Sequence, residues 1–144
     1  MITVERLTSS SAISLEDIHA LLLQLRRDKD EPLGTRDDLE AITSDKNVLF
    51  IVVKDDKKVI GMATGYLITK FGKRTGFVED VVVDDGYRGQ GLGQKVMEKL
   101  LEESKKAGAT QMYLTSGHDR VAAQSLYQKL GFKKRDTDVF KLEF

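Results

Sequence analysis

The sequence contains no cysteine and only two histidines, His19 and His118. Without cysteine, the chain can form no disulfide, no thiolate nucleophile and no cysteine-based metal site. The two histidines are far apart along the chain, which argues against a histidine-rich metal site. We therefore expect no bound metal.

The chain also lacks an excess of either charge, because 23 lysines and arginines balance 23 aspartates and glutamates. This balance argues against bulk attraction to nucleic acid or to an anionic membrane. Apolar runs such as Val81–Val83 are far too short to span a bilayer. Residues 1–6 lack the basic start and apolar core of a signal peptide. These absences predict a soluble, cytoplasmic protein with no nucleic-acid or membrane partner.

A length of 144 residues suits one domain, expected over residues 1–144. Apolar residues at helical spacing predict helices at about residues 15–25, 35–43, 93–106 and 120–130. Alternating and β-branched runs predict strands at 2–7, 48–53, 59–69, 77–83 and 111–115, with closing strands at Phe132 and 139–144. The order β-α-α-β-β-β-α-β-α-β predicts a single α/β domain with a mixed central sheet flanked by about four helices.

Side chains at three helix starts are expected to act as caps. Ser14 stands three residues before Asp17, an arrangement like a capping box, and Thr35 precedes Asp38 at the same spacing. Asp119 is expected to cap the last helix.

The most informative segment is a glycine-rich turn between a buried strand and a helix, Tyr87-Arg88-Gly89-Gln90-Gly91-Leu92-Gly93. Backbone N–H groups at a helix start lack partners within the helix, and the helix dipole favours negative charge there. Glycines let a ligand approach the backbone closely, and Arg88 adds a positive charge. The segment therefore predicts a phosphate-binding cradle.

Two common phosphate-binding patterns do not fit this turn. The G-x-G-x-x-G fingerprint places Gln94 at its third glycine when it starts at Gly89. A Walker A pattern from Gly86 to Gly91 requires lysine where Leu92 stands. The pattern that the turn does satisfy is Arg-x-x-Gly-x-Gly, formed by Arg88, Gly91 and Gly93.

The Val81–Val83 run followed by this turn resembles the acetyl-CoA signature of the GNAT superfamily of N-acetyltransferases. A second signature with the family's spacing is formed by Ala123, Tyr127, Lys129, Gly131 and Phe132. The order of elements is similar to the family fold as well, so the resemblance spans nearly the whole chain.

The resemblance implies a role for acetyl-CoA as co-substrate. Backbone groups of Val81, Val82 and Val83 would pair with its pantetheine arm, and Tyr127 would place a hydroxyl near the thioester sulfur. The pyrophosphate would lie on backbone N–H groups of Arg88, Gly89, Gln90, Gly91, Leu92, Gly93 and Gln94. One position departs from the family pattern, since Arg120 stands where many members have asparagine.

The chemistry needs a base, because an aliphatic amine with a pKa near ~10 is protonated at neutral pH. Glu79 lies on strand 77–83, which is the most apolar and is expected to be central, so burial there would raise its pKa. On a regular strand Asp80 would point to the opposite face. Tyr127 is a suitable acid for the thiolate leaving group, whose thiol has a pKa of about 8.5. The lack of cysteine favours direct transfer in a ternary complex.

Several alternatives remain open. The run from Glu79 to Arg88 is locally similar to glucosamine-6-phosphate N-acetyltransferases, but the acceptor-lining segments 26–36 and 66–76 show no recognisable pattern. A small-molecule amine is the preferred acceptor. A protein N-terminal or lysine acetyltransferase is the first rival, disfavoured by the segment Tyr113–Ser116, and a non-catalytic acyl-CoA sensor is the second. A homodimer through the apolar C-terminal strand is also open.

Overall fold

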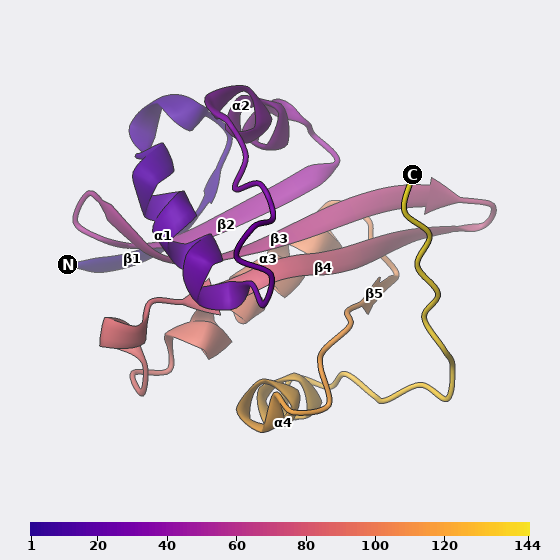
Figure 1. Cartoon of the computed structure of the whole chain (residues 1–144). Helices are drawn as coiled ribbons and strands as arrows, with labels where there is room; N and C mark the ends of the chain where they lie inside the picture. Colours follow the sequence, from indigo (N-terminus) through magenta and orange to yellow (C-terminus); the bar gives the residue numbers. More distant parts are fainter.

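A computed structural model describes residues 1–144. Its centre is one five-stranded sheet in which the strands follow chain order (Figure 1). The strands are β1 (Ile2–Leu7), β2 (Val48–Asp55), β3 (Lys58–Lys70), β4 (Lys73–Val83) and β5 (Gln111–Tyr113). Pairs from β1 to β4 are antiparallel, and β5 runs parallel to β4. The predicted mixed α/β sheet is confirmed.

Four α-helices surround the sheet: α1 (Leu15–Leu25), α2 (Arg36–Ser44), α3 (Leu92–Lys106) and α4 (Val121–Lys129). Short 3₁₀ turns cover Ser10–Ala12 and Asp85–Tyr87. None of the helices has the length and apolarity that crossing a bilayer requires.

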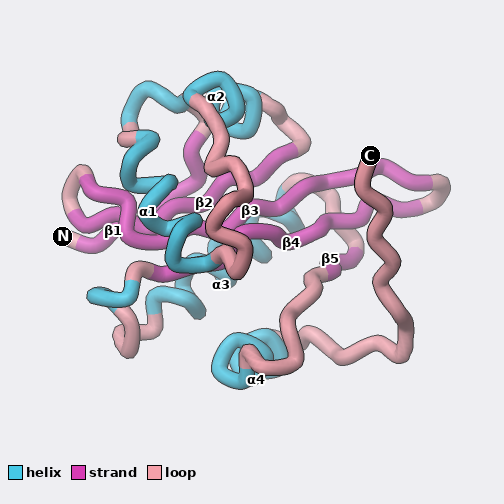
Figure 2. Tube along the Cα trace, in the orientation of Figure 1, coloured by secondary structure: helices cyan, strands magenta, loops and turns pink.

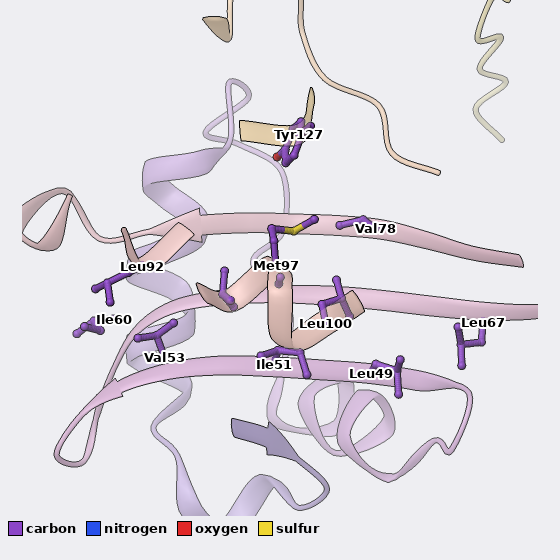
Figure 3. Packing of buried hydrophobic residues seen from close by; sticks show 12 residues of the cluster. Leu49, Ile51, Val53, Ile60, Leu67, Val78, Leu92, Met97, Leu100 and Tyr127 are labelled. Carbon is purple, nitrogen blue, oxygen red and sulfur yellow. The ribbon is translucent and has the colours of Figure 1, made fainter. Parts of the chain in front are cut away.

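Each face of the sheet has its own apolar core, because alternate strand residues point to opposite sides. On one face, α3 packs Val96, Met97 and Leu100 against strand residues such as Ile51 (Figure 3). On the other face, α1 and α2 pack against residues such as Phe50. The sheet is therefore covered on both sides, as expected for a layered domain.

Two expectations about strands are wrong. The central strand is β3, not β4, and β2 is the most buried, because its first six residues are all buried. No strand follows α4, so the expected closing strands at Phe132 and 139–144 do not form within the chain. Residues of the last segment instead lie outside the sheet as a loop (Figure 2).

The capping predictions had mixed outcomes. Thr35 and Asp38 form the expected capping box at α2. Ser14 does cap α1, but it accepts from the N–H of Glu16, and Asp17 accepts from the N–H of Val59 at 3.0 Å instead. Asp17 therefore links α1 to the start of β3.

Candidate functional site

The glycine turn leaves several backbone N–H groups without partners at the start of α3. Gly91 is the N-cap residue with φ +74°, a left-handed conformation that favours glycine, and no side chain caps the helix. The N–H of Lys95 donates to the carbonyl of Gly91 at 3.2 Å, so the three preceding helical N–H groups have no acceptor in the helix. A Cβ at Gly89 or Gly91 would project into open space. The turn thus presents donors to a ligand.

A hollow of about 290 Å³ lies over this turn. It is lined by Val83, Tyr87, Arg88, Gly89, Gly91, Leu92, Gly93, Gln94 and Leu126. A larger hollow of about 470 Å³ lies elsewhere, over β1 and α3, but charged side chains such as Lys99 and Glu102, paired with each other at 3.3 Å, dominate its lining. We place the candidate site at the smaller hollow because it contains the open donors.

Hydrogen bonds hold the turn in place from two directions. The hydroxyl of Tyr87 donates to Asp55 at 2.8 Å. Gln24 on α1 donates to Asp84 at 3.0 Å, and its side-chain oxygen accepts from the N–H of Asp85 at 2.9 Å. The hydrogen bond from the Gln24 side-chain amide lowers the pKa of Asp84, which keeps this carboxylate ionised. The cradle is therefore fixed to both β2 and α1.

Strand β4 has an unpaired edge beside the hollow. Its pairing with β5 covers only Thr75 to Phe77, opposite Gln111 to Tyr113. From Val78 to Val83, β4 pairs with β3 alone, and the chain after β5 diverges from it (Figure 1). An open strand edge offers alternating N–H and C=O groups to an extended partner.

A β-bulge interrupts β4 where the sequence has its two acids. Thr64 pairs with Glu79 and Met62 with Val82, so Ala63 faces two residues of β4. One of them, Asp80, has φ +52°, which is unusual for a residue with a side chain. As a result Val78 packs on the α3 face while Val82 packs on the α1 face, although they are four residues apart.

The bulge overturns the expectation that Glu79 and Asp80 point to opposite faces. Asp80 precedes Val81, whose side chain packs on the α3 face, and so points to the α1 side, where the charges of Arg26 and Glu31 act on its pKa. Glu79 follows Val78, which faces α3, and so points to the α1 side as well. Both acids raise the pKa of Tyr66 on β3, after the larger effect of burial. The expectation assumed a regular strand, and the bulge makes β4 irregular at Asp80.

Both carboxyls are harder to ionise than ordinary ones. Burial raises the pKa of Glu79, and the charge of Asp80 raises it further. Burial is also the main cause of the raised pKa of Asp80, and Arg26 partly opposes it. A carboxylate with a raised pKa is a better proton acceptor at neutral pH, so the pair suits general-base chemistry.

Tyr127 is buried on α4, with 6% of its surface exposed. Its ring joins the core cluster that contains Val78 and Met97 (Figure 3) and meets Phe132 edge-on at 6.1 Å between centroids. Burial raises its pKa, and the charge of Arg120 partly opposes this. The hydroxyl therefore stays protonated at neutral pH and can donate a proton.

The loop before α4 differs from expectation in its use of Asp119. Arg120 is the N-cap residue of α4, and no side chain caps this helix. Asp119 instead forms an ion pair with Arg27, which follows α1, and this pair lowers the pKa of Asp119 after the larger effect of a backbone hydrogen bond. The pair joins the end of α1 to the start of α4, while His118 is exposed.

Most of the predicted cofactor-binding residues line the hollow, but Val81, Val82 and Tyr127 do not. Gln90 is exposed and does not line the hollow either. The side chains of Val81 and Val82 pack into opposite cores, so only their backbone can meet a ligand. Sequence reasoning missed Tyr66, because its place on the face of Glu79 follows from the pairing of Thr64 with Glu79, which the structure supplies.

Residues 15–132 match the sequence profile of the acetyltransferase (GNAT) family. The chain belongs to this family. The match includes β4, the glycine turn and α4, and so covers the whole candidate site.

Curated relatives include a glucosamine 6-phosphate N-acetyltransferase from Trypanosoma brucei brucei, 35% identical over 82 residues, which are 55% of this chain and 54% of that enzyme. A ribosomal protein bS18-alanine N-acetyltransferase from Escherichia coli is 31% identical over 74 residues, 51% of this chain and 50% of that enzyme. The chain thus spans about half the length of these GNAT relatives. A glucosamine-6-phosphate N-acetyltransferase structure from Arabidopsis thaliana superposes with a TM-score of 0.79 at 24% identity, covering 99% of this chain and 98% of that one. At this identity, the likeness supports the GNAT fold alone.

Proposed function

We propose that the protein transfers the acetyl group of acetyl-CoA to a primary amine of a small molecule, by direct attack in a ternary complex. The observation that carries this proposal is the open cradle beside an unpaired strand edge. Unpartnered N–H groups at the start of α3 fit a diphosphate, and the edge from Val78 to Val83 fits an extended amide-containing arm. Acetyl-CoA has both features and supplies the activated acetyl thioester.

The residues of the cradle and the two candidate catalytic side chains have distinct roles in the proposal. Backbone N–H groups of the glycine turn hold the diphosphate, and Arg88, held by Asp85 at 2.6 Å, adds a positive charge beside it. Glu79 takes the proton from the acceptor ammonium. Tyr127 donates its proton to the departing sulfur, because a phenol can protonate a thiolate. The two acids on the α1 side also favour binding of a cationic amine.

A protein acceptor is the second candidate, supported by the similarity to the ribosomal-protein alanine acetyltransferase. A screen with acetyl-CoA and pools of either small amines or peptides, followed by CoA release, separates the two. Turnover on small amines alone supports the proposal. Turnover on peptides alone contradicts it. No turnover on any pool, despite acetyl-CoA binding, favours a sensor.

Replacing Glu79 with glutamine should lower kcat/KM by about 10²-fold, at the low end for a general base because the side chain is partly exposed. A base must be deprotonated, so wild-type activity should fall as the pH drops through the raised pKa of Glu79. That fall should disappear in the variant, as measured by a pH profile of kcat/KM. Glu40→Gln, the same change at an exposed position on α2, serves as control. Equal kcat/KM for Glu79→Gln and wild type at every pH would remove Glu79 from the mechanism.

A further inference from the structure

A glutamine near the end of α1 makes two hydrogen bonds to the turn that leads into the cradle. The side-chain NH₂ group of Gln24 donates to Oδ2 of Asp84 at 3.0 Å, and its side-chain oxygen accepts from the N–H of Asp85 at 2.9 Å. The side chains of Gln24 and Asp84 are half-buried, so water replaces a lost partner only in part. We call this pair of hydrogen bonds the Gln24 clamp.

The two residues that the clamp holds also organise the turn itself. The second carboxylate oxygen of Asp84, Oδ1, accepts from the N–H of Gly86 at 2.9 Å. The carboxylate of Asp85 holds the guanidinium of Arg88 at 2.6 Å. The clamp therefore connects α1 to the start of the turn and, through Asp85, to the cation beside the open N–H groups.

We propose that Gln24 is a positioning residue for acetyl-CoA, which holds the cradle in the shape that binds the diphosphate. This role rests on the proposed function, because it requires acetyl-CoA to bind at the glycine turn. Gln24 does not line the hollow, so it acts through the turn and not by contact with the ligand. A site that already has its bound shape loses less entropy on binding, so loss of the clamp should weaken acetyl-CoA binding.

The order of donors and acceptors makes the clamp specific. Asp84 accepts two hydrogen bonds, whereas Gln24 donates one and accepts one. Gln24→Glu would place one carboxylate against another. Asp84→Asn would leave two donors facing each other, whichever way the two amides are turned. With both changes, the amide at position 84 donates to the carboxylate at position 24, which still accepts from the N–H of Asp85, so every contact is restored.

Isothermal titration with acetyl-CoA tests the clamp as a double-mutant cycle. Gln24→Glu and Asp84→Asn should each weaken binding about tenfold, and the double variant should bind within about twofold of wild type. For Asp84→Asn, electrostatics alone predicts the opposite, because loss of a negative charge near the cradle favours a diphosphate. Asp37→Asn, the same change at an exposed position on α2, is the matched control and should bind as wild type does.

The pH dependence separates this role from a general loss of stability. In Gln24→Glu the two facing carboxylates raise the pKa of one of them, which gains a proton as the pH falls and can then donate to the other. Lys58 and Arg88 also act on Asp84, but both stay cationic at and below neutral pH. The ratio of the variant's dissociation constant to that of wild type should therefore fall towards one as the pH is lowered from about 8 to about 5.5. Groups that titrate in both proteins, such as the ligand phosphates, cancel in this ratio.

The outcomes distinguish this role from the proposed function. If wild type and both single variants bind acetyl-CoA equally well, Gln24 has no positioning role, although the proposed function stands. A double variant that binds no better than the single ones, or a ratio that does not change with pH, also overturns the role. A wild type that binds no acetyl-CoA overturns the proposed function and this role with it. Thermal unfolding followed by circular dichroism checks that every variant is folded at the temperature of the titration.

Discussion

Replacing Tyr127 with phenylalanine should lower the rate of acetyl transfer by about 10³-fold and leave the affinity for acetyl-CoA unchanged. The ring of Tyr127 is buried in the core and packs against Phe132, and phenylalanine keeps both contacts. Only the hydroxyl is lost, and with it the proton for the departing thiolate. Single-turnover kinetics with saturating acetyl-CoA measure the chemical step apart from product release.

Tyr113→Phe is the matched control for this experiment. Tyr113 lies on β5 and stacks on Phe77 with centroids 5.9 Å apart, and its hydroxyl meets only Arg135, at 3.5 Å. Its loss should change the transfer rate little. A Tyr127→Phe enzyme with wild-type single-turnover rate would show that the sulfur takes its proton from another source, such as water.

Replacing Gly91 with aspartate should weaken acetyl-CoA binding by about 10³-fold. A Cβ at this position meets nothing within 4 Å, and Gly91 lines the hollow, so we expect the new carboxylate to lie close to the bound diphosphate. Two like charges about 4 Å apart near a protein surface repel by about 4 kcal/mol, which is close to three powers of ten in the dissociation constant. Isothermal titration with acetyl-CoA measures the change.

Gly72→Asp separates this effect from backbone strain. Gly72 lies at the tip of the β3–β4 hairpin with φ +77°, close to the φ of +74° at Gly91, and a Cβ there also meets nothing within 4 Å. Both substitutions should therefore destabilise folding by a similar amount, about 1–2 kcal/mol. Only Gly91→Asp should weaken acetyl-CoA binding. Equal affinities for the two variants would show that the glycine turn does not hold the diphosphate.

The glycine turn could be predicted from sequence because its requirements are local. The end of a strand, glycines at positive φ and a helix start without a capping side chain can all be recognised from a few consecutive residues. The capping box at Thr35 was predictable for the same reason. The roles of Asp17 and Asp119 were not, since their partners, Val59 and Arg27, are distant in the sequence.

Features that depend on pairing between strands could not be predicted in this way. The bulge at Asp80 arises from the register between β3 and β4, and a single sequence does not reveal that register. Its consequence, two acids on one side of β4, changes the electrostatics of the site. The segment from Val139 to Phe144 has the alternation of a strand, but alternation does not say whether a partner strand exists in the same chain.

Titration of the purified protein with acetyl-CoA by calorimetry tests the central claim most directly. We expect micromolar-range binding at one site per chain, with loss of that binding in Gly91→Asp and its retention in Gly72→Asp. Absence of binding by wild-type protein would mean that the turn from Arg88 to Gly93 is only a structural connection between β4 and α3. That result would contradict the proposed acetyl transfer.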